Sequence, residues 1–571
     1  MYQTPTHCQQ IVHADSHEAA YDLADPPQPD QAELVDFPAD LPEVAAGQLF
    51  LDGDSELQPD QFLDSTGMAD IVEPADVAEF ASRVDEPADE PADEQAEFQD
   101  AEAQEHEDSE ENDIAQQLTE VRKTQRYNLR STTTDKHVYA VLSYKEAEVI
   151  YGPQAVREAG FTELRNCIDK GVWEYLSPVS KLVKPIPSKL FLTPKMSPTG
   201  EFKLLKGRIV GGGHRQDHAM FTDSEISSPT VSLTSVMMGA ALAAHKQQHV
   251  MTLDHKAAYL NAAMKGPEVI MLLTPDVSSL LIELDSSYTQ YLRSDRKIAV
   301  RLKKALYGCI QSAVLWYNEL SSTIEGMGFK KNPYDMCSFM RTTPDDVCTI
   351  LVYVDDLFIM SGNKTALKEV ADTLKNKYGG ITTTEGHIHD YLGIRWDFTE
   401  PGQVTLSMEG YIKDLLTKYG PYTRSSIPGA PDLFQINKES PALGKVKKEL
   451  FHSAVMTLHY LAKRVRPDIL AAVSFCATRV LAPSEQDMSK LQRILGYLSI
   501  TLEQKLLLKV GAKLELRAYV DSSFGTYMDG KSVTGIVIYL GAAPIYFKSS
   551  KQKIVTKSST EAELIGISDA L

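Results

Sequence analysis

The stretch TILVYVDDLFIM, residues 349–360, is apolar almost throughout except for two adjacent acids, Asp355 and Asp356. The apolar segments on either side predict two strands joined by a hairpin whose loop is Asp355-Asp356. Burying even one unpaired carboxylate costs several kcal/mol, roughly the whole stability of a domain. A hairpin that holds both carboxylates at the edge of a sheet would also suit magnesium, which binds oxygen ligands and commonly uses one or two carboxylates. The turn and the metal site are compatible interpretations.

A third acid of the same kind lies about a hundred residues earlier, in VMTLDHKAAYLNAAM, residues 250–264. Here Asp254 ends a short apolar segment that is predicted to be a strand. A lone aspartate at a strand end is more often a helix cap than a metal ligand. Together with Asp355 and Asp356, however, it supplies the three carboxylates of a two-metal nucleotidyl transfer, in which one ion activates a primer 3'-hydroxyl and the other holds the triphosphate.

Charge is distributed very unevenly along the 571 residues, whose net charge is -22. Residues 1–120 contain 34 acidic residues and one basic residue, Arg83, whereas the rest of the chain contains 56 basic and 45 acidic residues, a balance of +11. A basic body of this size favours a polyanionic partner, although charge alone does not separate a nucleic acid from a membrane surface.

The acidic segment shows the composition of a disordered region. EPADEPADE, residues 86–94, is a short repeat with a further EPAD copy at 73–76. Such a segment repels itself and buries too little apolar surface to offset chain entropy.

The six cysteines are scattered without a CxxC pair, and neither an N-terminal signal nor an apolar run long enough for a bilayer is present. We therefore expect a reducing, intracellular location without a membrane partner.

Several blocks of the sequence, in order, resemble the reverse transcriptase of copia-type retrotransposon Pol polyproteins. The resemblance runs from roughly residue 140 to the end of the sequence. The blocks are FKLLKGRIVGGG (202–213), SSPTVSLTSV (227–236), TLDHKAAYLNAAM (252–264), RLKKALYGCIQSAVLWY (301–317), LVYVDD (351–356), YLGIRWDF (391–398) and HYLAKRVRPDILAAVS (459–474).

The resemblance implies roles for individual residues in catalysis. Asp254, Asp355 and Asp356 match the three aspartates that bind two Mg²⁺ ions, with Mn²⁺ as an alternative. Tyr259 matches the aromatic residue whose ring would collide with a 2'-hydroxyl and so select deoxynucleotides; the alternative is a core tyrosine at helical spacing.

It also implies contacts with the nucleotide and the template. Lys206 and Arg208 match residues that grip the triphosphate through charge-assisted hydrogen bonds, although they could also be solvated strand charges. Gly308 and Gln311 match positions where nucleotide and template approach the backbone closely.

The chain departs from the family pattern in two places. Where the family usually has a lysine, and then a proline and an arginine, around Gln311, this chain has Ile310, Ser312, Ala313 and Val314. It also has three glycines at 211–213, where a lysine is common. The loss of these cations weakens the prediction of tight template and triphosphate binding.

The C-terminal segment is predicted to form three strands and the start of a helix. LELRAYVDSSFG (514–525), TGIVIYLGAAPIYFKSSKQ (534–552) and SSTEAELIGISDAL (558–571) resemble the first half of a ribonuclease H domain. Asp521 and Glu563 match its first two metal-binding acids. Because the family has further acids beyond the helix, we expect no RNA cleavage from this chain.

The predicted fold is α+β. It is a right-hand polymerase with fingers and palm at 170–415 and thumb and connection at 416–510, followed by a partial ribonuclease H-like α/β domain at 511–571. A disordered acidic spacer at 1–125 precedes it.

The predicted function is primer extension with dNTPs on an RNA or DNA template. The resemblance further implies a homo- or hetero-oligomer, element-encoded protein partners, and a cytoplasmic virus-like particle with nuclear entry. The alternative is an inactive or domesticated remnant that binds nucleic acid without copying it.

Overall fold

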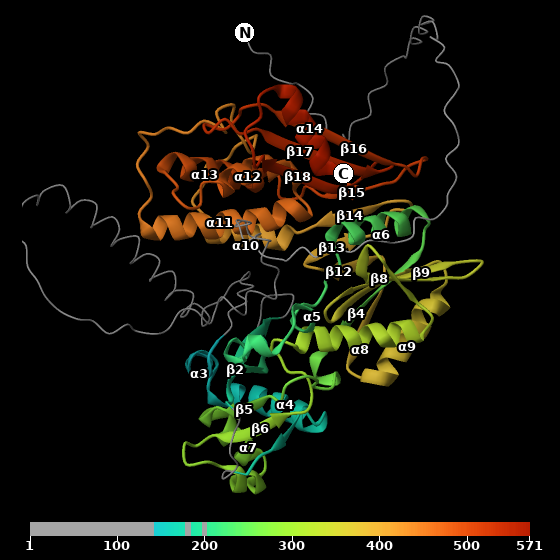
Figure 1. Cartoon of the computed structure of the whole chain (residues 1–571), viewed down its shortest axis with the longest axis vertical. Helices are drawn as coiled ribbons and strands as arrows, with labels where there is room; N and C mark the ends of the chain where they lie inside the picture. The colour runs from blue at the N-terminus through green and yellow to red at the C-terminus, as the bar shows by residue number, and fades with distance from the viewer. Residues whose placement is uncertain (1–141, 178–183, 197–201) are drawn as a thin grey trace, which may run out of the picture. The chain divides into compact units, whose positions relative to one another are not determined.

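The computed structural model describes residues 142–177, 184–196 and 202–571 (Figure 1). The acidic segment at 1–125, for which the sequence predicts disorder, lies outside these residues. Helices and strands alternate along the described chain, and the strands form four sheets. The fold is therefore mixed α and β, as the sequence predicts at this coarser level.

The first sheet has five strands in the order β1-β6-β5-β2-β3. Neighbouring strands are antiparallel except for the parallel pair β2 and β5. The helices α4 and α7 pack on each other, and α4 packs on β3, around a separate apolar core. The elements are α3 (Tyr144–Tyr151), α4 (Pro153–Asp169), β1 (Trp173–Tyr175), β2 (Ile186–Met196), β3 (Phe202–Gly211), β5 (Ile270–Leu273), α7 (Pro275–Leu284) and β6 (Ile298–Leu302).

The break between α3 and α4 follows from two residues. Gly152 has φ +84, a conformation that glycine adopts without a steric penalty, and its N–H closes α3 by donating to the carbonyl of Glu148. Pro153 then stands at the first position of α4, where its missing N–H is not needed and its fixed φ suits a helix. The two helices therefore turn at this point instead of continuing as one.

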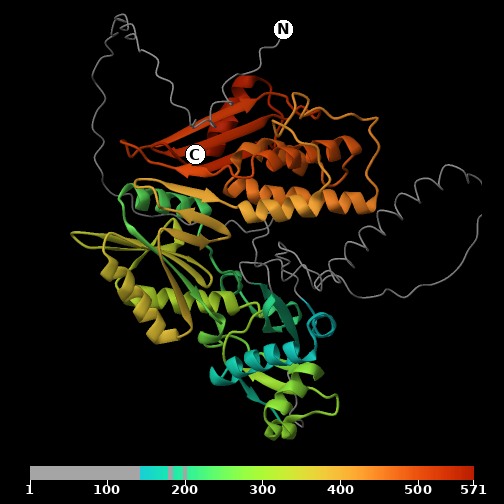
Figure 2. The ribbon, with the colours of Figure 1, turned by 180° about the vertical axis from the view of Figure 1, so that it is seen from behind.

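The second sheet has six antiparallel strands in the order β11-β4-β10-β9-β8-β7. The helix α6 contacts β10 on one face, and α8 and α9 lie against the other face (Figures 1 and 2). The elements are α6 (Leu233–His245), β4 (His249–His255), α8 (Ser312–Gly326), β7 (Lys330–Asn332), β8 (Asp335–Thr342), β9 (Val347–Tyr353), β10 (Asp356–Ser361), α9 (Lys364–Tyr378) and β11 (Ile381–Gly386).

Short helices connect these two sheets. They are the 3-10 helices η2 (Gly213–Arg215), η3 (His218–Met220) and η4 (Tyr259–Asn261), and the helix α5 (Asp223–Ile226). A further 3-10 helix, η5 (Ser286–Tyr291), lies between α7 and β6 and packs on α7.

The third sheet has the order β12-β13-β14-β15, and four helices accompany it. Its strand β15 lies far along the chain from β14 and pairs with it. Strands from both sides of the predicted border at residues 415 and 416 therefore belong to one sheet. The elements are β12 (Ile388–Tyr391), β13 (Ile394–Asp397), β14 (Val404–Ser407), α10 (Glu409–Tyr419), α11 (Lys445–Arg464), η6 (Pro467–Ile469), α12 (Leu470–Ala477), α13 (Glu485–Ile500) and β15 (Leu506–Leu508).

The fourth sheet consists of β16 (Leu516–Ser523), β17 (Val533–Leu540) and β18 (Ala543–Lys551). The helix α14 (Ser559–Ala570) packs on β16 and β17. These are the three strands and the helix that the sequence predicts for this region. The strand β18 also contacts α6, α12 and β15, so one apolar core continues from the six-stranded sheet into this segment.

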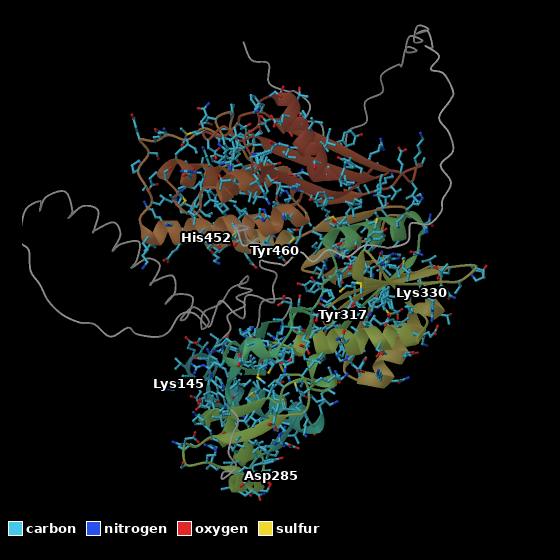
Figure 3. The ribbon with its side chains drawn as sticks, viewed as in Figure 1. Lys145, Asp285, Tyr317, Lys330, His452 and Tyr460 are labelled. Atoms are coloured by element: carbon cyan, nitrogen blue, oxygen red, sulfur yellow. The ribbon has the colours of Figure 1, made fainter. Side chains whose placement is uncertain are left out.

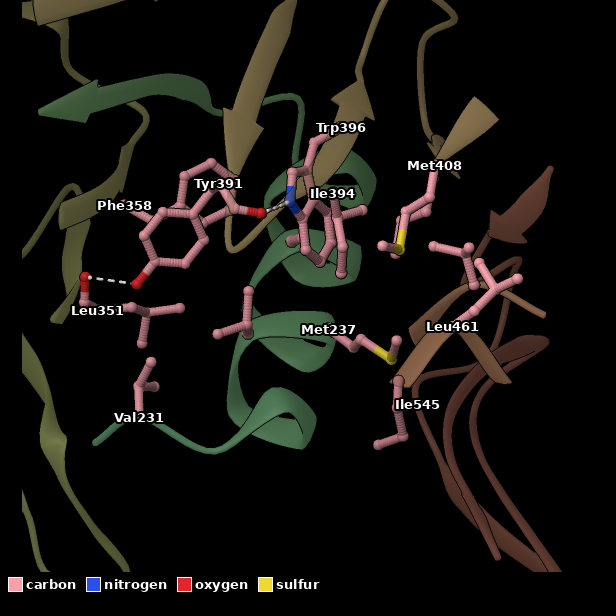
Figure 4. Packing of buried hydrophobic residues seen from close by; sticks show 14 of the residues in the cluster. Val231, Met237, Leu351, Phe358, Tyr391, Ile394, Trp396, Met408, Leu461 and Ile545 are labelled. Carbon is pink, nitrogen blue, oxygen red and sulfur yellow. Dashed lines mark hydrogen bonds between the residues drawn. The ribbon is translucent and has the colours of Figure 1, made fainter. Parts of the chain in front are cut away.

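Aromatic rings fill the core beside β10. Phe358 stacks on Tyr391 with ring centroids 5.0 Å apart, and the Tyr391 hydroxyl donates a hydrogen bond to the carbonyl of Leu351 (Figure 4). The indole of Trp396 donates to the carbonyl of Tyr391 at 3.1 Å. The polar ends of both rings thus have partners, which removes the penalty of burying them.

Two features bear on the sequence predictions for compartment and membrane. The five cysteines among the described residues are all free and buried. No helix in the described part of the chain combines the length and the apolar character needed to cross a membrane.

Candidate active site

The hairpin between β9 and β10 has a two-residue loop, Val354-Asp355, because Tyr353 pairs with Asp356. The sequence prediction of Asp355-Asp356 as the loop was therefore wrong by one residue. Both strands are apolar on both faces, so alternation along them does not determine the register. Asp356 consequently belongs to a strand and Asp355 to the loop.

The register of the sheet brings the third acid to the same place. Asp356 lies directly opposite Asp254 in the antiparallel pair of β10 and β4. The backbone carbonyl of Asp355 accepts a hydrogen bond from the amide of His255 at 3.0 Å. The structure thus gathers the three acids that the sequence proposes, although they are separated by about a hundred residues.

Burial and neighbouring charges raise the proton affinity of Asp355 and Asp356. The pKa of Asp356 is raised to about 7, first by burial and then by the charges of Asp355 and Asp254. Burial also raises the pKa of Asp355, to which Asp254 adds, whereas its own backbone amide, Arg208 and Lys206 oppose the rise. None of the ion pairs formed by the described residues includes these acids. The like charges are therefore held together without a neutralising partner in direct contact.

Such a set of carboxylates fits a divalent metal by its chemistry. Carboxylate oxygens are the ligands that Mg²⁺ and Mn²⁺ prefer, and a bound cation would remove the repulsion between them. In the described parts of the chain, however, no group of three or more His, Cys, Asp or Glu side chains is arranged to hold a metal ion. The three acids are neighbours, but their side chains do not converge on one point as metal ligands would.

A basic pair lies on β3 of the five-stranded sheet. Lys206 is exposed and Arg208 half-buried. Loss of hydration lowers the pKa of Lys206, and Arg208 and Lys195 lower it further, while Asp254 and Asp355 act in the opposite direction. The charges on β3 and the acids of the six-stranded sheet are thus within electrostatic reach of each other.

Gly207 and Glu163 hold this part of β3 against α4. A Cβ on Gly207 would meet the backbone oxygen of Ala159 at 2.8 Å, so only glycine allows this approach. The buried carboxylate of Glu163 accepts a hydrogen bond from the amide of Ile209 at 3.2 Å, and burial raises its pKa. The sequence analysis did not identify Glu163, since nothing in its helical surroundings marks it.

Tyr259 is the first residue of η4 and packs against Tyr307. Its ring lies 5.0 Å from that of Tyr307, and the guanidinium of Arg208 lies 5.7 Å from the Tyr307 ring. Burial raises the pKa of Tyr259 to about 12, and the charge of Asp355 contributes. Tyr259 is half-buried and within reach of the acids, which a residue of the closed core would not be.

Gly308 and Gln311 take part in packing in this structure. Gly308 has φ +82, and a Cβ there would meet the oxygen of Gly211 at 2.3 Å. The amide of Gly213 donates to the carbonyl of Gly308 at 2.9 Å, where a Cβ on Gly213 would have no room. The glycine run that departs from the family pattern therefore fits against the segment at 307–309.

Gln311 is buried and joins the same segment to Gln216, which follows the glycine run. Its side-chain oxygen accepts a hydrogen bond from Gln216 at 3.0 Å, and the Gln216 oxygen accepts one from the amide of Ile310. Gly308 and Gln311 thus make contacts within the protein, and their roles toward nucleotide and template stay predictions.

The loop residue Val354 has φ +54. A β-branched side chain rarely adopts this region, and such a residue costs about 1–3 kcal/mol unless its surroundings enforce it. The sequence analysis missed this feature, because a valine in an apolar run shows no sign of an unusual backbone.

The acids of the C-terminal segment lie on two elements that pack together, β16 and α14. Asp521 is exposed on β16, and the carboxylate of Glu563 on α14 accepts a hydrogen bond from the amide of Ser522 at 3.2 Å. Gly566 allows the close contact, since a Cβ there would lie 2.6 Å from the Ser522 hydroxyl oxygen.

The region that contains Asp254, Asp355 and Asp356 matches a known protein family. Residues 171–426 match the family described as reverse transcriptase (RNA-dependent DNA polymerase). They form a reverse transcriptase domain. The domain contains all three acids, the basic pair and Tyr259.

The relatives of this reverse transcriptase domain are Pol polyproteins of retrotransposons. The chain is 30% identical over 417 residues to the retrovirus-related Pol polyprotein from transposon RE1 of Arabidopsis thaliana, covering 71% of this chain and 26% of the relative. It is 28% identical over 386 residues to the Pol polyprotein from transposon TNT 1-94 of Nicotiana tabacum, covering 66% and 28%. The chain spans about a quarter of the length of these curated relatives.

Among solved structures, the foamy viral protease-reverse transcriptase in complex with double-stranded DNA covers 77% of this chain and 61% of its own at 12% identity. The TM-score of 0.37 is too low to bear on the fold.

Proposed function

We propose that this chain is the RNA-directed DNA polymerase of a copia-type LTR retrotransposon, a nucleotidyltransferase that extends a primer with dNTPs. The observation that carries the proposal is the meeting of Asp254 and Asp356 in the β4–β10 register, beside Asp355 and within electrostatic reach of Lys206. The reverse transcriptase domain at 171–426 gives this arrangement its reaction.

In this proposal the two sheets are the fingers and palm of a right-hand polymerase. The five-stranded sheet, with Lys206 and Arg208 on β3, takes the place of the fingers, and the six-stranded sheet with the three acids takes the place of the palm. The helices α10 to α13 with the third sheet correspond to the thumb and connection, and the fourth sheet corresponds to a partial ribonuclease H-like domain.

The side chains have separate tasks in nucleotidyl transfer. Asp254, Asp355 and Asp356 would hold two Mg²⁺ ions, which supply activation of the primer hydroxyl and stabilisation of the departing phosphate oxygen. Lys206 and Arg208 bind the triphosphate oxygens through charge-assisted hydrogen bonds and thereby orient the α-phosphate. The positive charges of β3 also offset the charge that accumulates beside the acids.

Tyr259 selects the sugar. Its ring is supported from behind by Tyr307, which in turn is capped by Arg208, so the ring has little freedom to move away from a bulky substituent. A 2'-hydroxyl pressed against it would be rejected by steric clash, whereas a deoxyribose would not.

A second candidate function is nucleic-acid binding without copying. It is favoured by the segment at 310–314, where the family's cations are absent and Ser312 and Val314 are buried. The ordered acids and basic pair oppose this candidate, because a remnant without activity has no reason to maintain unrelieved repulsion between Asp355 and Asp356.

The proposal extends to partners and location. A primed RNA or DNA template and dNTPs are the substrates, and a homo- or hetero-oligomer with element-encoded proteins in a cytoplasmic virus-like particle, with nuclear entry, is the expected setting. Asp521 and Glu563 supply the first two acids of a ribonuclease H-like site.

Primer extension by the purified protein on homopolymer RNA tests the function directly. We expect incorporation of the complementary dNTP that depends on Mg²⁺ or Mn²⁺ and stops in chelator. Binding of the primed template without any extension in either metal would support the second candidate instead.

A further inference from the structure

The indole of Trp316 on α8 is bonded to the loop that carries Asp355. Its Nε1–H donates a hydrogen bond of 2.7 Å to the carbonyl oxygen of Val354, the residue before Asp355. Trp316 is only 1% exposed, so the bond lies in a medium of low dielectric constant where its loss is costly.

The other carbonyl of the two-residue loop is also bound from outside the hairpin. The amide of His255 on β4 donates to the carbonyl of Asp355. The rings of His255 and Trp316 meet edge to face with centroids 5.0 Å apart, and Tyr378 of α9 packs 5.2 Å from the Trp316 ring. The residues that supply the two donors, Trp316 and His255, therefore pack on each other, and α8, β4 and α9 together fix their positions.

The helix that carries Trp316 is itself anchored beside the sheet. The next residue, Tyr317, labelled in Figure 3, donates its hydroxyl to the carbonyl of Met336 on β8 at 2.8 Å. The indole consequently has a fixed position relative to β9 and β10.

The residue that accepts this hydrogen bond, Val354, has a backbone conformation that valine does not favour by itself. With φ +54 and a β-branched side chain, Val354 would relax to negative φ if its carbonyl were released. Such a rotation would re-orient the following peptide, and with it the carboxylate of Asp355.

We propose that Trp316 is a positioning residue for polymerisation, whose indole N–H holds the Val354 carbonyl and thereby sets the direction of the Asp355 carboxylate. The inference rests on the proposed polymerase function. Trp316 acts through the loop, and the residues that select and grip the nucleotide lie on other elements.

The variant Trp316→Phe keeps a buried aromatic ring and removes the N–H. We expect kcat for single-nucleotide incorporation to fall by about tenfold, the rate equivalent of ~1.4 kcal/mol, while KM for the dNTP changes by less than about twofold. Because a smaller fraction of active protein would also lower the apparent kcat at constant KM, kcat is calculated per active site, counted by titration of the protein with primed template.

Trp396 offers a matched control. It is also fully buried and donates its indole N–H to a backbone carbonyl, that of Tyr391, but this carbonyl lies outside the β9–β10 loop (Figure 4). We expect Trp396→Phe to lower stability and leave kcat per folded molecule unchanged. Equal losses of kcat in the two variants would overturn the proposal.

Hydrogen exchange followed by mass spectrometry gives a readout that does not depend on activity. In peptides covering residues 347–361, Trp316→Phe should exchange faster than the wild type, and Trp396→Phe should not. If the wild type fails to extend primers, the proposed function fails, while the exchange comparison still tests the hold on the loop.

A second replacement covers the case in which Trp316→Phe does not fold. Site-specific incorporation of 3-benzothienylalanine retains the shape of the indole and replaces only the N–H by sulfur. Faster exchange in 347–361 with this residue supports the proposal, and wild-type exchange together with wild-type kcat would overturn it.

Discussion

The six-stranded sheet and the C-terminal three-stranded sheet both place acids on a strand, but they hold them differently. Asp254 and Asp356 lie on β4 and β10, two neighbouring strands in the interior of the sheet, and burial and mutual charge raise the pKa of Asp356 to about 7. Asp521 lies exposed on β16 at the edge of its sheet, and Glu563 accepts a hydrogen bond from a backbone amide. Among the described residues the acids of the first group have no ion-pair partner, whereas Glu563 of the second group has a hydrogen-bond partner within the protein.

The difference shows that acids matched by a sequence pattern need not form equivalent sites. A cost that the fold does not relieve indicates that something outside the protein relieves it, and a cation is the simplest candidate. The comparison therefore separates a site prepared for metal from a pair of acids that the protein itself accommodates.

The largest expected effect is on catalysis by the three acids of the six-stranded sheet and its β9–β10 loop. Asp355→Asn should lower kcat/KM for primer extension by roughly 10³-fold or more, because it removes a metal ligand, while the fold remains intact since one repelling charge is lost. Single-nucleotide incorporation and circular dichroism measure the two effects. Asp521→Asn is the matched control in the C-terminal sheet and should leave extension unchanged. Normal polymerisation by Asp355→Asn would show that the metal assignment is wrong.

How much of this site the sequence predicts depends on the range of the interactions. The strand ending near Asp254 and the three C-terminal strands follow from local patterns, and the order of the motifs singles out the three aspartates. The loop position does not follow, because the apolar runs on both sides of Asp355 allow either register. The contact of Trp316 with Val354 also stays hidden, since it joins residues on separate elements and leaves no local signal.

A smaller effect is expected at Tyr259, which either selects the sugar by steric clash or only packs in the site. Tyr259→Ala should raise the ratio of ribonucleotide to deoxynucleotide kcat/KM by roughly 10- to 100-fold, because discrimination rests on one steric clash. Deoxynucleotide incorporation should fall less, since base pairing and triphosphate contacts remain. The ratio is measured on one template for wild type and variant. If both sugars lose rate together and the ratio stays constant, Tyr259 only packs against Tyr307.

A smaller effect is expected on stability in chelator. The pKa of Asp356 is about 7 in the folded protein and about 4 in an unfolded chain. Between these values the folded state binds the Asp356 proton more tightly, so the contribution of Asp356 to the free energy of unfolding falls as pH rises from about 4 through 7 and then levels off. Asp356→Asn removes this fall.

Urea unfolding of the two proteins at several pH values provides the measurement. Asp356→Asn should be more stable than the wild type at pH 8 by about 1–2 kcal/mol, after allowance for partial exposure, and nearly equal to it at pH 4. Added Mg²⁺ should reduce the difference at pH 8, because the cation stabilises only the wild-type carboxylates. Parallel stability curves at all pH values would mean that the repulsion among the acids is relieved in the metal-free protein.

The smallest effect is expected from the corresponding change in the C-terminal sheet. Glu563→Gln retains a side-chain oxygen that can accept the hydrogen bond from the Ser522 amide, so the contact between α14 and β16 survives. The free energy of unfolding in chelator at pH 8 should therefore change by no more than about 0.5 kcal/mol, the range of substitutions that break no buried interaction. Glu563→Ala provides the contrast, because it removes the acceptor and should cost about 1 kcal/mol. A gain from Glu563→Gln as large as that expected from Asp356→Asn would mean that the C-terminal acids also carry unrelieved repulsion. The two sheets would then be alike in the very property that is taken here to distinguish them.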